Sequence, residues 1–134
     1  MYETILVATD GSSPANRAVD AAVDIASTFD ADLHVVSVVD TSRYGDSMLS
    51  GTEDVIDELR GRAEEILEDV ETRADVDVTT EIRRGRPHEE IVGYADSTDA
   101  DLLVVGNRGL GASGQIGSTA ERVVRYVDRP VLTV

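Results

Sequence analysis

Short apolar runs recur along the chain, separated by longer stretches in which apolar and polar residues mix. Three of these runs, at Thr4–Ala8, residues 33–39 and Leu102–Val105, are rich in β-branched residues. Runs of this kind indicate strands that are buried on both faces. Residues 76–82 instead alternate apolar and polar positions, which predicts a half-covered edge strand, and residues 130–134 form a last apolar run. The pattern therefore predicts five strands.

Four intervening stretches repeat their apolar residues at steps of three and four positions, the period of an amphipathic helix. Pro14 and Pro87 stand where the first and third helices begin, a position that suits a residue without an amide hydrogen. We expect Ser13 to cap the first helix, and Ser50 with Glu53 to form a capping box before the second. The expected helices span about residues 13–28, 51–70, 87–95 and 118–127.

The order strand, helix, strand, repeated along the whole chain, predicts an α/β fold. Right-handed crossovers between parallel strands place the helices on both faces of one sheet, so we expect a doubly wound five-stranded parallel sheet. The length of 134 residues suits one domain, residues 1–134. Such sheets bind ligands beyond the carboxyl ends of their strands, where the winding reverses. The loops after the first, second and fourth strands are therefore the candidate site.

The composition of the chain excludes several classes of ligand and of catalytic group. The chain has 27 acidic and 12 basic residues and a net charge of -15, so nucleic acids and anionic membranes would repel it. All basic residues are arginine, which excludes a P-loop or Schiff-base lysine, and the absence of cysteine excludes thiolate chemistry. No apolar run approaches the ~18 residues of a membrane span. The amino terminus does not resemble a signal peptide, so we expect a cytoplasmic protein.

A glycine-rich segment, residues 106–117, lies between the fourth strand and the last helix. Its backbone amides, the start of the following helix and the hydroxyls of Ser118 and Thr119 are neutral donors that suit an anion such as phosphate. The alternative is a connection with ordinary capping, because Ser118 and Glu121 have capping-box spacing. Asp10 follows the first strand and fits a sugar hydroxyl or a metal ion; its alternative role is to form a turn.

Several motifs together resemble the universal stress protein family over essentially the whole chain. They are the opening I-L-V-A-T-D-G-S, the helix start S-P-x-x-x-A, the ending V-V-D of the second strand and the terminal R-P-V-L-x-V. The resemblance implies an adenine nucleotide alpha hydrolase-like fold with strand order 3-2-1-4-5. The ATP-binding branch of the family carries G-x-x-G, nine residues, then G-S or G-T. Here Gly106, Gly109 and Gly117-Ser118 match, with seven residues in the spacer.

By this resemblance the ligand is ATP, AMP or ADP, with Mg²⁺ as a companion of the phosphates. Arg108 would add positive charge near the phosphates or would face solvent. The implied adenine and ribose contacts come from Asp10, Val38, Val105 and Gly106, and the implied phosphate contacts from Gly109, Gly117, Ser118 and Thr119.

The function implied is a regulatory, nucleotide-binding role in the stress response. The sequence shows no positioned base and no metal-binding cluster, since its two histidines lie 54 positions apart. We therefore expect no catalytic residues and at most weak ATP hydrolysis. The resemblance also implies a homodimer through the last strand, which begins at Pro130 and ends at Val134. The alternative is a dimeric interaction module that has lost the nucleotide, which the shorter spacer favours.

The excess of acidic residues predicts that the protein is adapted to high salt, as in a halophile. Carboxylates on a body of 14.4 kDa repel one another, and molar salt reduces the screening length to about 3 Å. We expect the melting temperature to be higher in molar KCl than in dilute buffer. An unchanged melting temperature across these conditions would contradict this expectation.

Overall fold

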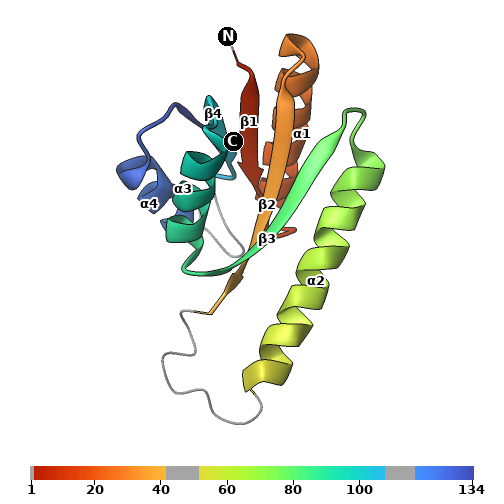
Figure 1. Ribbon diagram of the computed structural model, residues 1–134, viewed down its shortest axis with the longest axis vertical. Helices are drawn as coiled ribbons and strands as arrows, with labels where there is room; N and C mark the ends of the chain where they lie inside the picture. The colour runs from red at the N-terminus through yellow and green to blue at the C-terminus, as the bar shows by residue number, and fades with distance from the viewer. Residues whose placement is uncertain (1, 42–51, 108–116) are drawn as a thin grey trace.

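The computed structural model describes residues 2–41, 52–107 and 117–134, which form one parallel five-stranded sheet flanked by helices (Figure 1). The strand order is β3-β2-β1-β4-β5, and every neighbouring pair is parallel. The doubly wound α/β fold and its predicted strand order are confirmed. The strands are β1 (Thr4–Ala8), β2 (Asp32–Asp40), β3 (Val78–Gly85), β4 (Leu102–Val105) and β5 (Val131–Thr133).

Two pairs of helices cover the two faces of the sheet (Figure 1). The alternating side chains of β1 show why both faces are apolar: Ile5 and Val7 belong to the core cluster beneath α1 and α2, whereas Leu6 belongs to the cluster beneath α3 and α4. All three are fully buried. The helices are α1 (Ser13–Phe29), α2 (Thr52–Arg73), α3 (Pro87–Thr98) and α4 (Ser118–Tyr126).

Helices α1 and α4 begin where the sequence predicts, but the N-cap of each is one residue earlier than the capping residue that the sequence suggested. The N-cap of α1 is Ser12, not Ser13, because its extended backbone lets Ser12 Oγ accept the N–H of Ala15 at 3.3 Å. The N-cap of α4 is Gly117, and no side chain caps this helix. The capping box of Ser118 and Glu121, which the sequence left as an alternative to phosphate binding, is therefore not formed. Glu121 instead pairs with Arg125 one turn further along α4.

Strand β3 begins and ends later than the predicted range of residues 76–82. Its ladder with β2 continues to the pair Asp40 and Gly85, so Arg83 and Arg84 are strand residues. Pairing with the long neighbouring strand outweighs the weaker apolar pattern at this end. The expected position of β3 at a sheet edge is confirmed. The predicted capping residue Ser50 lies outside the described residues.

Asp101 joins the turn after α3 to the start of β1. Its Oδ2 accepts the backbone N–H groups of Glu3 at 2.8 Å and Thr4 at 2.9 Å. The hydrogen bonds from Thr4 and then Glu3 lower the pKa of Asp101. Its contribution to stability is therefore present above the pKa of the unfolded chain and is lost as the pH falls through the lower, folded-state pKa.

Arg129 anchors the connection between α4 and β5 against the end of α3. The guanidinium donates to Asp99 Oδ1 at 3.0 Å and to the carbonyl of Ala100 at 2.8 Å. The hydrogen bond to the Asp99 carboxylate raises the pKa of Arg129, although desolvation opposes this effect. This contact holds β5 at the second edge of the sheet. Among the described residues, none of the helices has the length and apolar character that crossing a membrane requires.

Candidate functional site

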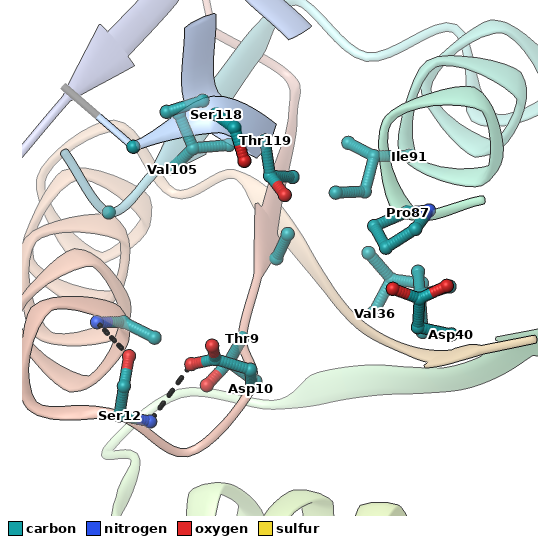
Figure 2. Close-up of a pocket in the computed structure, with 16 residues that line it drawn as sticks. Thr9, Asp10, Ser12, Val36, Asp40, Pro87, Ile91, Val105, Ser118 and Thr119 are labelled. Carbon is teal, nitrogen blue, oxygen red and sulfur yellow. Dashed lines mark hydrogen bonds between the residues drawn. The ribbon is translucent and has the colours of Figure 1, made fainter. Parts of the chain in front are cut away.

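A cavity of about 320 Å³ opens at the carboxyl ends of β1, β2 and β4 (Figure 2). The winding of the sheet reverses between β1 and β4, which is where a doubly wound sheet is expected to bind a ligand. Residues from the starts of α1, α3 and α4 complete the walls. The positive ends of three helix dipoles therefore surround this one cavity.

One end of the cavity is an apolar slot. Val36 and Val38 line it from β2, where residues two apart share a face, and Pro87 and Ile91 line it from the first turns of α3. Figure 2 shows Val36, Pro87 and Ile91 together on one side of the cavity. A slot between a strand and a helix suits a flat apolar ring.

The other end is formed by the start of α4. Gly117, Ser118 and Thr119 line the cavity there, and Ser118 and Thr119 bring hydroxyl groups. The first-turn amides of a helix have no partner within the helix, and here no side chain caps them. Neutral donors of this kind hold an anion without a lysine.

The turn from β1 to α1 contributes Thr9, Asp10 and Ser12. Asp10 Oδ1 accepts the N–H of Ser12 at 2.9 Å, and Thr9 Oγ1 accepts the N–H of Gly11 at 3.1 Å. Gly11 has a φ of 80°, which favours glycine. Asp10 therefore forms the turn that the sequence left as an alternative, and it also faces the cavity. This turn holds Ser12 in the conformation that caps α1.

The end of β4 lies directly against the start of α1. A Cβ atom on Gly106 would stand 3.0 Å from the carbonyl carbon of Pro14 and 3.1 Å from the amide nitrogen of Ala15. Only glycine permits this approach without movement of the backbone. The next residue, Asn107, accepts the N–H of Gly117 at 2.6 Å. This hydrogen bond brings the start of α4 to the end of β4.

A chain of side-chain contacts holds the first turns of α3. Arg83 Nε lies 3.1 Å from Glu90 Oε1, and the guanidinium stands 5.4 Å from the centre of the Tyr94 ring. The Tyr94 hydroxyl lies 3.2 Å from His34 Nδ1. Burial raises the pKa of Tyr94, with a further contribution from the Glu81 carboxylate. Arg83 therefore links β3 to the first turns of α3 through Glu90 and Tyr94.

The residues expected at the site divide into two groups. Arg108, Gly109 and the spacer 110–116 lie outside the described residues, so the structure does not place them. The structure brings the other seven together on the walls of the cavity; these are Asp10, Val38, Val105, Gly106, Gly117, Ser118 and Thr119.

Sequence reasoning missed the α3 wall and several neighbours of the predicted residues. Val36 and Asp40 share a face of β2 with Val38, so the alternation along this strand was a usable signal for both. Pro87 and Ile91 lie one helical turn apart, but only the packing of α3 shows that they face β2. Among the described residues, no group of three or more His, Cys, Asp or Glu side chains could hold a metal ion.

Comparison with known proteins shows the family of this chain. The model of the universal stress protein family matches residues 1–134. A universal stress protein of Methanocaldococcus jannaschii is 36% identical over 140 residues, which cover 100% of this chain and 82% of that protein.

Two solved structures are similar to this chain and contain a ligand. A universal stress protein in complex with cAMP has a TM-score of 0.77 and 33% identity, covering 99% of this chain and 97% of that one. The universal stress protein from Archaeoglobus fulgidus in complex with dAMP has a TM-score of 0.67 and 26% identity, covering 98% of this chain and 97% of that one.

Because Gly106 lies so close to α1, we expect replacement by alanine to destabilise the protein at this position, whereas the same replacement at Gly61 should stabilise it. Gly106→Ala should lower the free energy of unfolding by about 1–3 kcal/mol, because its Cβ meets backbone atoms that cannot rotate away. Gly61→Ala is the matched control: it lies within α2 with nothing within 4 Å, and should raise stability by about 0.5–1 kcal/mol. Urea unfolding measures both. A Gly106→Ala variant as stable as the parent would contradict the tight contact.

Proposed function

Because the chain belongs to the universal stress protein family, we propose that it is a cytoplasmic regulatory protein of the stress response that binds an adenine nucleotide in this cavity. The observation that supports the proposal is the division of the cavity into an apolar slot and an end rich in neutral donors. An adenine nucleotide is divided in the same way, with a flat ring at one end and charged phosphates at the other. The relatives in complex with cAMP and dAMP support the same ligand class.

In this proposal the adenine enters the slot between β2 and α3, and the phosphates meet the start of α4. The anion is attracted in spite of the net charge of -15, because helix amides act at short range whereas surface carboxylates are screened by salt. The proposed adenine and ribose contacts are Asp10, Val38, Val105 and Gly106. The proposed phosphate contacts are Arg108, Gly109, Gly117, Ser118 and Thr119.

The proposed role is regulatory, with at most weak ATP hydrolysis. Phosphoryl transfer requires a positioned attacking group and strong stabilisation of developing charge. Asp10, an acid beside the start of α1, is instead hydrogen-bonded within its own turn. Magnesium would accompany a triphosphate by binding its oxygens, as that ion usually does.

A second candidate function is an interaction module of the same fold that holds no nucleotide. One specific contact favours it: the N–H of Gly117 donates to the carbonyl of Asn107 at 2.6 Å and is not directed at a ligand. The seven-residue spacer, two shorter than in the ATP-binding branch, also favours it.

We also propose a homodimer through β5. This strand lies at an edge of the sheet, and Leu132 on it is 38% exposed. Val124 on the neighbouring helix α4 is 47% exposed. An edge strand with exposed apolar residues favours pairing with a second copy, and a two-fold axis satisfies both edges at once.

Whether the purified protein carries a nucleotide distinguishes the nucleotide-binding role from the interaction module. We expect mass spectrometry of the denatured, purified protein to reveal ATP, ADP or AMP. Gly117→Val should abolish ATP binding measured by calorimetry while leaving the far-ultraviolet circular dichroism unchanged, because its side chain would occupy the space where backbone meets phosphate. Gly61→Ala serves as the control and should bind ATP like the parent. No nucleotide in the parent, or equal ATP affinity in the Gly117→Val variant, would contradict the proposal.

The dimer is tested by light scattering at several concentrations. The parent should have twice the monomer mass, and Leu132→Glu should shift the equilibrium to monomer, because it places a buried charge at the interface. Val55→Glu is the matched control, since Val55 is also 38% exposed but lies on α2. Monomer mass for the parent at every concentration would exclude pairing through β5.

A further inference from the structure

The outer edge of β3 carries charges in an order that suits pairing with a second copy of the same strand. The strand order leaves β3 with β2 as its neighbour, and in residues 2–41, 52–107 and 117–134 no strand lies on its other side. We propose that two copies of this chain pair in antiparallel fashion through this edge. The edge is separate from the cavity and from β5, so the pairing does not depend on a bound nucleotide.

Alternate residues of β3 direct their backbone groups away from β2. The carbonyl of Gly85 accepts the N–H of Thr41, the residue after β2, at 3.2 Å, so the backbone of Gly85 faces β2. The N–H and C=O groups of one strand residue point to one side, and those of the next residue point to the other. Arg84, Ile82 and Thr80 therefore present their donors and acceptors at the open edge, where a second strand can bind them.

The charges of this segment change sign along its length. Asp75 and Asp77 precede the strand, whereas Arg83 and Arg84 lie at its end and Arg86 follows it. Arg84 and Arg86 are exposed, and neither forms an ion pair with another described residue. Charges on an edge strand often prevent pairing. An antiparallel copy reverses their order, however, so the acidic start of each strand meets the basic end of the other.

One register matches the side chains on both faces of the strand. When the two copies of Thr80 lie opposite each other, Ile82 of each copy lies opposite Val78 of the other. On the other face, Arg83 of each copy lies opposite Asp77 of the other. Threonine pairs, apolar pairs and pairs of opposite charge are cross-strand contacts that stabilise an antiparallel sheet. The two-fold axis forms each of the unlike pairs twice.

Neighbouring registers match less well. A register centred on Glu81 would bring two carboxylates directly opposite each other, which is destabilising. A register centred on Ile82 would place the apolar Val78 opposite Arg86. The Thr80 register is therefore the one that we expect.

The net charge of -15 on each copy opposes this pairing at low salt. In molar KCl the screening length falls to about 3 Å, which removes repulsion between distant charges, whereas charges in direct contact are screened much less. We therefore expect pairing through β3 in molar KCl and not in dilute buffer. The mass expected for pairing through β5 in dilute buffer is unchanged.

Light scattering tests the pairing in the Leu132→Glu background, which is designed to prevent pairing through β5. This variant should be a monomer in dilute buffer and a dimer in molar KCl. Adding Asp77→Arg should weaken dimerisation about tenfold or more, because it sets like charges opposite Arg83 twice in each dimer. Adding Asp57→Arg is the matched control. Asp57 is an exposed residue of α2, so this change alters the net charge equally and should leave dimerisation as in the background.

A disulfide tests the register. The chain has no cysteine, so Thr80→Cys introduces a single thiol. Residues opposite each other in a hydrogen-bonded antiparallel pair have Cα atoms about 5.5 Å apart, a separation that a disulfide can span. In the Leu132→Glu background, mild oxidation in molar KCl should convert Thr80→Cys to covalent dimers on a non-reducing gel. Thr28→Cys, at an exposed position of α1, is the control and should stay largely monomeric.

Three results would overturn pairing through β3. The first is a monomer mass for Leu132→Glu at every salt concentration. The second is equal weakening of the dimer by Asp77→Arg and Asp57→Arg, and the third is no more cross-linking of Thr80→Cys than of Thr28→Cys. Either of the last two would mean that the copies associate through another surface. Far-ultraviolet circular dichroism of each variant checks that it is folded, and nucleotide binding by the parent is measured separately.

Discussion

The reversal of winding between β1 and β4 is the constraint on which the rest of the structure depends. Both strands are buried on their two faces, so every connection must cross the sheet as a helix, and the chain must change faces once. At that point the helices diverge and leave an opening at the strand ends. The cavity is therefore a consequence of burying the sheet, and its lining comes from whatever residues end those strands and begin those helices.

Two kinds of electrostatic interaction act in the cavity, and they differ in the distance over which they act. The net charge of -15 is spread over the molecule, whereas the amides at the start of α4 act within a few ångströms of any bound group. The acidic residues of the cavity are Asp10, in the turn after β1, and Asp40, at the end of β2, whereas the α4 end is lined by neutral donors. The net negative charge therefore does not by itself exclude an anion from the α4 end of the cavity.

The edge of the sheet and the cavity are physically connected. The amide of Asn107 donates to the carbonyl of Val134, and its own carbonyl accepts the N–H of Gly117 at the start of α4. Two hydrogen bonds therefore join the residue that follows β5 to the start of α4, where the cavity has its neutral donors.

The sequence by itself determined the elements and their order, because apolar periods record which faces are buried. Its resemblance to a family indicated seven residues that line one cavity in the structure. Which of two adjacent residues caps a helix depended on the tertiary structure. Ser12 caps α1 in place of Ser13 because Asp10 fixes the preceding turn. The α3 wall and Asp40 joined the site only on folding, because periodicity shows that a residue is buried but not which distant element packs against it.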